Sequence, residues 1–161
     1  MLLNGISVVG IGKLGLCAAA CFADKGWQVI GVDVNQDTIA AVNEGRSPIY
    51  EPGLGELITK CQGRLFATDS YKYAIENSEV TFITVPTPSM GDGGFSTKYV
   101  EAVVQSIATI LKDKEAFHVV VITSTVMPGA TEGVIKPLIE VVSGKKCGID
   151  FGLCYNPEFI A

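Results

Sequence analysis

The chain has 161 residues, of which 48% are hydrophobic and 18% charged, so it is the size of one domain with a substantial buried core. The net charge of -5 and the pI near 4.8 argue against a nucleic-acid or phospholipid surface, because no basic cluster exceeds the pair Lys145-Lys146. No apolar run reaches the roughly 18 residues of a membrane span, and the first residues lack the basic stretch of a signal peptide. We therefore expect a cytoplasmic protein with a small-molecule partner.

The cysteines favour a reducing compartment with free thiols, because they are odd in number and form no CxxC pair. They are Cys17, Cys21, Cys61, Cys147 and Cys154. Cys17 and Cys21 lie four residues apart on a predicted helix, so they are either a metal or redox pair or two small buried thiols. No histidine joins them, so we expect buried thiols and no metal site.

Short apolar runs that are typical of buried parallel strands alternate with helical stretches along the chain. The predicted strands are Ile6–Val9, Val29–Val32, Arg64–Thr68, Val80–Val85, Val119–Thr123 and Phe151–Cys154. The predicted helices are 14–25, 36–44, 54–61, 71–77, 97–112 and 130–142. This alternation predicts an α/β fold with a doubly wound parallel sheet in the strand order 3-2-1-4-5-6, whose ligands bind at the carboxyl ends of the strands.

The first predicted strand leads into a glycine-rich turn, Gly10-Ile11-Gly12-Lys13-Leu14-Gly15, which opens a helix rich in small residues. In this pattern the first glycine permits a tight turn, the second lets the backbone approach a pyrophosphate, and the third lets helix and strand pack closely. The helix N-terminus supplies N–H groups and a positive dipole end for the anion. These six residues are therefore predicted to bind a dinucleotide, although Lys13 is also explained as a solvated lysine at a helix start.

Asp33 stands at the carboxyl end of the second predicted strand. A carboxylate in this position accepts hydrogen bonds from both ribose hydroxyls of NAD and repels the extra phosphate of NADP. Because strand, glycines, helix, strand and acid follow in the required order, the sequence predicts NAD as the cofactor.

Four further segments follow along the chain, three of them at predicted strand ends. They are Gly45-Arg46-Ser47-Pro48-Ile49-Tyr50-Glu51-Pro52-Gly53-Leu54, Val85-Pro86-Thr87-Pro88, Ser124-Thr125-Val126-Met127-Pro128-Gly129 and Asn156-Pro157-Glu158-Phe159. In combination they resemble the UDP-glucose/GDP-mannose dehydrogenase family, and the resemblance runs across essentially the whole chain.

The resemblance implies the Rossmann-type NAD-binding domain of a nucleotide-sugar 6-dehydrogenase. Such an enzyme oxidises a primary alcohol to a carboxylate in two hydride steps with two NAD, through a cysteine thioester. The catalytic cysteine, the central helix and the sugar-binding domain are expected outside residues 1–161, and the full-length protein is expected to be a homo-oligomer. We expect this chain alone to bind NAD and to turn over no sugar.

Carried over by resemblance, Val85, Pro86, Thr87, Ser124 and Thr125 line the NAD site. Thr125 also positions a catalytic water, and Glu158 acts as a general base at the reacting sugar carbon. The substrate-binding segment comprises Glu158, Phe159, Ile160 and Ala161. Each residue has a simpler explanation: Thr125 as a helix cap, Glu158 as a solvated acid, and Pro86-Thr87-Pro88 as a rigid turn.

Two positions depart from the family pattern. Lys13-Leu14 replaces the usual Tyr-Val, and Thr38 stands where a lysine or arginine usually contacts the adenosine end. We hypothesise that Lys13 partly replaces the cation missing at Thr38. Unchanged NAD affinity in Lys13→Ala would refute this hypothesis.

UDP-glucose is the expected substrate, with GDP-mannose and UDP-N-acetylhexosamines as alternatives. A non-catalytic NAD-sensing module is a second hypothesis, but it gives no reason for Thr125 and Glu158 in these settings. A β-hydroxyacid dehydrogenase is a third, and it does not explain the Glu51-Pro52-Gly53 segment. His118, which precedes the fifth predicted strand, is expected to be structural or exposed.

Overall fold

The chain folds around one six-stranded parallel sheet with the strand order β3-β2-β1-β4-β5-β6. The computed structural model describes residues 5–91 and 93–158. The strands are β1 (Ile6–Val9), β2 (Val29–Val32), β3 (Leu65–Thr68), β4 (Val80–Ile83), β5 (His118–Ile122) and β6 (Phe151–Tyr155). This topology confirms the predicted doubly wound sheet, and its strand order reverses between β1 and β4.

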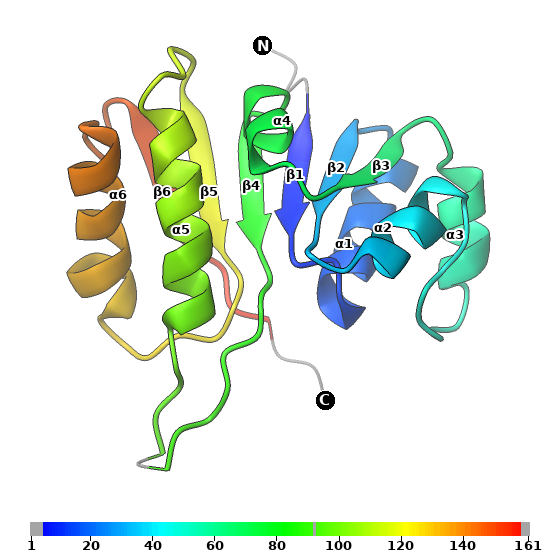
Figure 1. Ribbon diagram of the computed structural model, residues 1–161, viewed down its shortest axis with the longest axis horizontal. Helices are drawn as coiled ribbons and strands as arrows, with labels where there is room; N and C mark the ends of the chain where they lie inside the picture. Colours follow the sequence, from blue (N-terminus) through cyan, green and yellow to red (C-terminus); the bar gives the residue numbers. More distant parts are fainter. Residues whose placement is uncertain (1–4, 92, 159–161) are drawn as a thin grey trace.

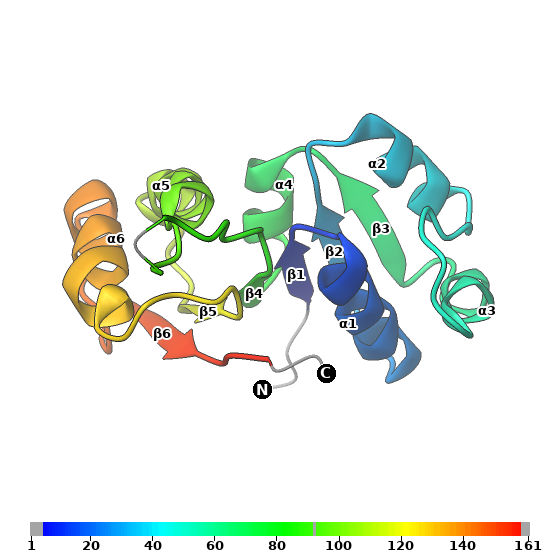
Figure 2. The ribbon, with the colours of Figure 1, turned by 90° about the horizontal axis from the view of Figure 1, so that it is seen from below.

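Helices cover the two faces of the sheet in the groups that right-handed crossovers require (Figure 1). One group is α1 (Lys13–Asp24), α2 (Gln36–Asn43) and α3 (Leu54–Lys60), which pack beside β1 to β3. The other is α4 (Tyr71–Glu76), α5 (Lys98–Leu111) and α6 (Lys136–Ser143). Figure 2 shows α5 and α6 on the opposite side of the sheet from α1. Among the described residues, no helix is long and apolar enough to cross a membrane.

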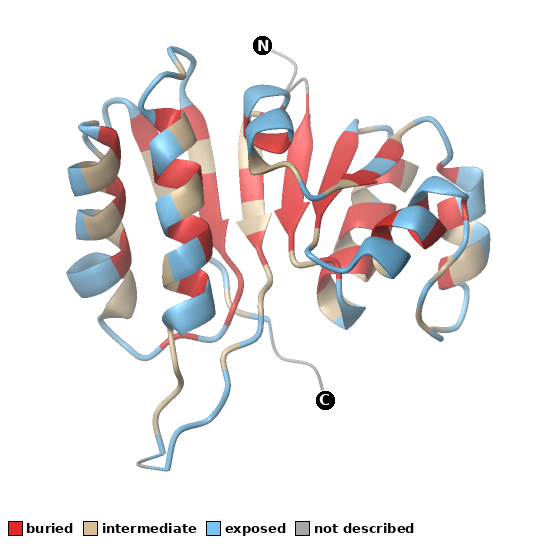
Figure 3. Ribbon diagram, in the orientation of Figure 1, coloured by how far each residue is buried: buried red, intermediate tan, exposed pale blue. Residues whose placement is uncertain are grey.

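The core lies in the strands and in the helix faces turned toward them (Figure 3). α5 shows why the sequence folds in this way, because its buried side chains recur every three or four residues. They are Val100, Val103, Val104, Ile107, Ala108 and Leu111. Full burial of each large aliphatic side chain contributes about 1.5–3 kcal/mol, so this stripe fixes α5 against the sheet.

β4 and the last predicted helix depart furthest from the predicted element boundaries. β4 ends at Ile83 instead of Val85, and the Thr84 hydroxyl that follows it bonds the Val9 and Gly10 carbonyls. The predicted helix 130–142 begins instead as a π-helical turn, η1 (Thr131–Ile135), before α6. Pro137 lies at the start of α6 and has no N–H for an intrahelical bond, so the regular α-helical pattern begins only there.

The side chain of Asn43 pairs with the outer edge of β3 at Ala67. The Asn43 amide nitrogen donates to the Ala67 carbonyl at 2.9 Å, and the Ala67 N–H donates to the Asn43 carbonyl at 2.8 Å. The carboxamide therefore takes the place of a neighbouring strand at Ala67. Such capping protects an edge from pairing with another chain.

A buried polar network ties together the amino ends of the central strands. His118 is the first residue of β5, not a residue before it, and it is fully buried. The Lys114 ammonium donates to His118 Nδ1 at 3.0 Å, so the imidazole must donate from Nε2 to the Thr81 hydroxyl at 2.7 Å. Thr81 and Ser7 continue the network at 2.6 Å, and Lys114 also donates to the Ser78 carbonyl. His118 is thus a structural residue.

The network predicts a specific loss of stability in acid. Burial, with the Lys114 ammonium beside it, lowers the pKa of His118 from 6.5 to about 3. The unfolded chain therefore binds more protons than the folded protein between these values, so stability falls as the pH drops from 6.5 toward 3. The loss is at most about 5 kcal/mol, at about 1.4 kcal/mol per pKa unit.

Urea unfolding of the wild type and His118→Gln between pH 7 and pH 5 measures this loss. We expect the wild type to lose more stability than the variant, because glutamine does not titrate. Parallel losses in the two proteins would contradict the assignment.

Candidate functional site

The glycine-rich turn joins β1 to α1 at the carboxyl edge of the sheet. Gly10 has a φ of +90°, which favours glycine, and a Cβ on Gly15 would lie 2.0 Å from the Gly10 carbonyl oxygen. These two positions therefore have the predicted roles in the turn and in helix packing. A Cβ on exposed Gly12 would meet no atom within 4 Å. The space above Gly12 is open, as approach of a ligand to the backbone requires.

Thr84 fixes this turn to the end of β4 and was not identified from the sequence. Its hydroxyl donates to the Gly10 carbonyl at 2.7 Å and lies within 3.1 Å of the Val9 carbonyl. A side chain on Gly15 would also meet the Thr84 hydroxyl, at 2.5 Å. The position of Thr84 just after a strand was the available signal, but a threonine in that place has many other uses.

The Asp33 carboxylate is held in place by two backbone donors. The Ile11 N–H donates to Oδ2 at 3.0 Å, and the Asn35 N–H donates to Oδ1 at 2.9 Å. Asn35 in turn caps α2 by accepting from the Asp37 and Thr38 N–H groups. The carboxylate at the end of β2 is thereby oriented toward the glycine-rich turn before any ligand arrives.

A pocket of about 550 Å³ lies between the glycine-rich turn and the loop after β4. Four of the predicted site residues line it: Gly10, Asp33, Val85 and Pro86. The other lining residues are mainly apolar or aromatic, and they are Val9, Val32, Val34, Tyr71, Pro88, Tyr99, Ala102 and Val103. The pocket therefore offers apolar walls and one carboxylate at the point where the strand order reverses.

Tyr71 and Tyr99 are the main lining residues that sequence analysis missed. Tyr71 begins α4 one residue after the cap Ser70, and Tyr99 stands in the first turn of α5. Burial and the nearby Asp33 carboxylate raise the pKa of the half-buried Tyr71 phenol, so its hydroxyl stays protonated. Tyr71 comes shortly after β3, whereas Tyr99 comes after the long loop that follows β4, and no sequence motif marked either residue.

The end of β5 carries one buried and one exposed hydroxyl. Ser124 is buried, and its hydroxyl donates to the Val85 carbonyl at 2.7 Å, which joins the ends of β4 and β5. Thr125 is exposed at the same edge of the sheet, and Thr87 is half-buried in the loop after β4. NAD contacts by Thr87, Ser124 and Thr125 stay predictions.

The end of β6 lies beside the end of β5. The Asn156 N–H donates to the Ile122 carbonyl at 2.9 Å, and the Asn156 amide donates to the exposed Glu158 carboxylate at 3.1 Å. Glu158 therefore stands at the carboxyl edge, as predicted. The proposed substrate residues Phe159, Ile160 and Ala161 lie outside the described residues.

Lys13 and Leu14 form the first turn of α1, where Leu14 is half-buried. Lys13 is a solvent-exposed lysine at the helix start, and its ammonium pairs with Glu51 at 2.8 Å. The hydrogen bond and charge of Glu51 raise the pKa of Lys13. Replacement by Lys13 of a cation missing at Thr38 stays a prediction.

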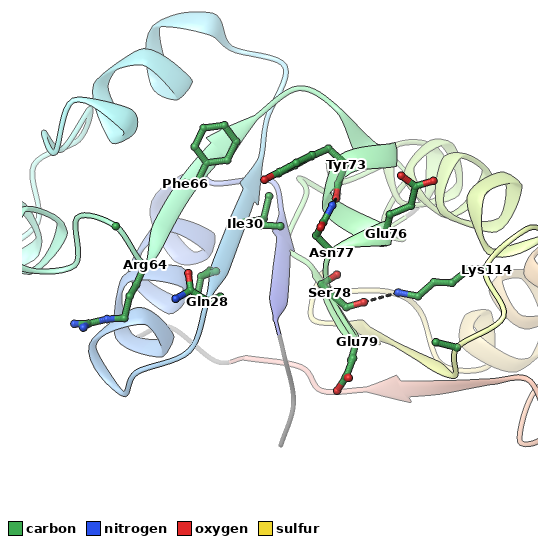
Figure 4. Close-up of a pocket in the computed structure, with 13 residues that line it drawn as sticks. Gln28, Ile30, Arg64, Phe66, Tyr73, Glu76, Asn77, Ser78, Glu79 and Lys114 are labelled. Carbon is green, nitrogen blue, oxygen red and sulfur yellow. Dashed lines mark hydrogen bonds between the residues drawn. The ribbon is translucent and has the colours of Figure 1, made fainter. Parts of the chain in front are cut away.

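A second pocket, of about 560 Å³, opens at the amino ends of the strands (Figure 4). Phe66 and Tyr73 stand on one side, and Lys114 reaches toward Ser78 on the other. None of the predicted site residues lines it. The two pockets thus lie at opposite edges of the sheet, and only the first contains the predicted chemistry.

The cysteines are all free, but the predicted burial is only partly correct. Cys61 is buried, Cys17 is half-buried, and Cys21 is exposed. Cys21 is four residues beyond Cys17, yet it lies on the solvent side of α1. Among the described residues there is no group of three or more His, Cys, Asp or Glu side chains that could hold a metal ion.

A pocket between the first glycine-rich turn and the switch in strand order is the dinucleotide site of doubly wound α/β proteins. The oriented carboxylate and the open approach above Gly12 fit NAD. The fold and the site therefore define an NAD-binding domain.

Comparison with known proteins identifies the family to which this NAD-binding domain is similar. Residues 4–161 match the family described as the UDP-glucose/GDP-mannose dehydrogenase family, NAD binding domain. The GDP-mannose 6-dehydrogenase of Pseudomonas aeruginosa is 45% identical over 157 residues, which cover 96% of this chain and 36% of that protein. The UDP-glucose 6-dehydrogenase of Haloferax volcanii is 40% identical over 156 residues, with the same coverage.

The solved structures agree with the sequences. A ternary complex of the Pseudomonas aeruginosa GDP-mannose dehydrogenase matches with a TM-score of 0.93 and 44% identity, over 97% of this chain and 36% of that chain. The chain belongs to the UDP-glucose/GDP-mannose dehydrogenase family and carries its NAD-binding domain. It spans about a third of the length of these relatives.

Substitution by alanine is expected to have different effects at Gly12 and at Gly15. Gly12→Ala adds a methyl group in open space, so the thermal midpoint should stay unchanged while NAD binding is lost. Gly15→Ala forces a contact of 2.0 Å with the backbone, so it should lower the midpoint strongly. Thermal unfolding and calorimetric titration of both variants test this difference. A variant Gly12→Ala that still binds NAD normally would argue against a pyrophosphate at this position.

Proposed function

We propose that the pocket beside Asp33 holds the adenosine half of NAD and that this chain is the NAD-binding part of a nucleotide-sugar 6-dehydrogenase. The pocket carries this proposal, because apolar walls suit the base and a fixed carboxylate suits the ribose diol. Val34 lies directly after Asp33 and is 85% exposed, so it offers a bare apolar surface to the base. Tyr71 and Tyr99 close the other walls.

The pyrophosphate would lie above Gly12. The first intrahelical bond of α1 runs from the Leu16 N–H to the Gly12 carbonyl, so the N–H groups before Leu16 point out of the helix start. These donors and the positive end of the helix dipole suit a diphosphate. Gly12 leaves them accessible, because no side chain stands above them.

The catalytic end of the cofactor would face the ends of β5 and β6. NAD supplies the hydride acceptor for oxidation of an alcohol. Thr125 and Glu158 are the exposed polar side chains that we assign to this end. Glu158 would act as a general base through a water, and Thr125 would orient that water.

GDP-mannose is the substrate that we propose first, and UDP-glucose, which the sequence analysis favoured, is the alternative. The support is the higher identity to the GDP-mannose enzyme, 45% against 40% for the UDP-glucose enzyme of Haloferax volcanii. A non-catalytic NAD sensor is less consistent with the chain, because both relatives are dehydrogenases over the same segment.

Cofactor preference is tested by titrating the chain with NAD and NADP. We expect saturable NAD binding, much weaker NADP binding, and a loss of about 10- to 100-fold in NAD affinity in Asp33→Ala, which removes charge-assisted bonds to the ribose. Asp113→Ala, an exposed acid at the amino edge, is the matched control. Thermal unfolding checks that Asp33→Ala is folded, because Asp33 also accepts two backbone bonds. Equal NAD and NADP affinities would refute the assignment of Asp33.

Catalysis is tested with chimeric enzymes. This chain replaces the matching segment of the Pseudomonas aeruginosa GDP-mannose enzyme or of the Haloferax volcanii UDP-glucose enzyme, and NADH formation is followed at 340 nm with each enzyme's own sugar nucleotide. We expect turnover, greater in the GDP-mannose chimera, and a fall of about 100-fold or more in kcat in Glu158→Gln. A chimera that binds NAD but is equally active with Glu158→Gln would exclude Glu158 as the base.

A further inference from the structure

Helices α1 and α3 pack side by side in the same direction and are joined at both ends by ion pairs. At one end Lys13 pairs with Glu51 at 2.8 Å, and at the other Lys60 pairs with Asp24 at 2.6 Å. The two pairs are closely matched in exposure, since the lysines are 70% and 66% exposed and both acids are 25% exposed. The two ion pairs should therefore contribute similarly to holding the two helices together.

Their surroundings differ because α1 begins at the ligand edge of the sheet and ends at the opposite edge. Lys13 directly follows Gly12, whose surroundings are open, whereas Lys60 and Asp24 stand where both helices end. A lysine in the first turn opposes the helix dipole, so it does not stabilise α1. It does add positive potential at the place where an anion would bind.

Glu51 offsets part of that potential, because its carboxylate pairs with the Lys13 ammonium at 2.8 Å. Its backbone is fixed by the start of α3, because the Leu54 N–H donates to the Glu51 carbonyl at 3.1 Å. Its carboxylate holds the lysine side chain along the flank of α1, toward α3. Burial, and secondarily the Glu51 charge, raises the pKa of the half-buried Cys17 thiol one turn further along α1. Glu51 therefore lies beside the first two turns of α1.

We infer that Glu51 is the counter-ion that sets the affinity of the glycine-rich turn for a diphosphate, by competing with it for the Lys13 ammonium. In the free protein Lys13 is bound to Glu51. When a diphosphate occupies the space above Gly12, Lys13 exchanges the carboxylate for a phosphate oxygen. Glu51 thus weakens binding of the diphosphate. Lys13 is a positioning residue that contacts a phosphate oxygen only after it has left Glu51. This inference rests on NAD binding at the glycine-rich turn.

The test uses three probes with this chain: NAD, ADP-ribose, which keeps the diphosphate, and adenosine, which has none. Glu51→Gln should bind NAD and ADP-ribose about two- to fivefold more tightly, and Lys13→Gln should bind them about two- to fivefold more weakly, the range for one charge at a helix terminus. Adenosine affinity should not change in either variant. The matched controls Asp24→Asn and Lys60→Gln should leave all three affinities unchanged.

The salt dependence of binding and the double variant Glu51→Gln/Lys13→Gln distinguish the counter-ion role of Glu51 from a purely structural role of the ion pair. Affinity for ADP-ribose should fall more steeply with salt in Glu51→Gln than in the wild type, because the released Lys13 charge is then screened. Most of the gain from Glu51→Gln should disappear when Lys13→Gln is also present. A structural role would instead shift the thermal midpoint in the variants of both ion pairs and leave the salt slope unchanged.

The experiment distinguishes failure of the counter-ion role from failure of the proposed cofactor site. Weaker or unchanged NAD binding in Glu51→Gln, while the wild type binds NAD, overturns the counter-ion role and leaves the cofactor site intact. Equal effects on adenosine and ADP-ribose also overturn it, because the diphosphate would not be involved. If the wild type binds neither NAD nor ADP-ribose, this inference and the proposed cofactor site fall together.

Discussion

The site depends on the close approach of α1 to the turn that precedes it. With 2.0 Å between a Cβ on Gly15 and the Gly10 carbonyl, the helix start can reach the end of β1 only because Gly15 has no side chain. Thr84 fixes the same turn to β4, and the Ile11 N–H fixes Asp33 to it. One steric constraint therefore places the helix dipole, the Asp33 carboxylate and the wall of the pocket relative to one another.

Much of this arrangement was predictable because it follows from local chemistry. The glycine spacing, the apolar strands and Asp33 each satisfy a requirement that a few neighbouring residues set, so the fold and the first half of the site could be read from the sequence. Tyr71, Tyr99 and Thr84 could not, because each becomes a site residue only when loops far apart in the sequence meet. The partner of Lys13 was missed for the same reason, since Glu51 belongs to a different loop. His118 was placed outside its strand because a histidine has no strand signature, and its burial depends on the distant Thr81 and on Lys114.

Family membership and catalytic function rest on different parts of the molecule. The match over residues 4–161 and the TM-score of 0.93 establish the family and its NAD-binding fold. The catalytic assignment depends instead on Thr125 and Glu158, two exposed residues at neighbouring strand ends. A fold alone does not specify a reaction, so these two positions carry the distinction between an enzyme and a cofactor sensor.

The buried network around His118 lies at the edge of the sheet opposite the cofactor pocket, and this separation has a consequence for how the domain can change. Folding stability draws on polar contacts at the amino ends of the strands, whereas the pocket that we propose for the cofactor is lined by loops at the carboxyl ends. A mutation in those loops therefore leaves the buried polar contacts at the amino ends in place. The loops around the pocket can therefore vary in sequence at little cost to the stability that the His118 network provides.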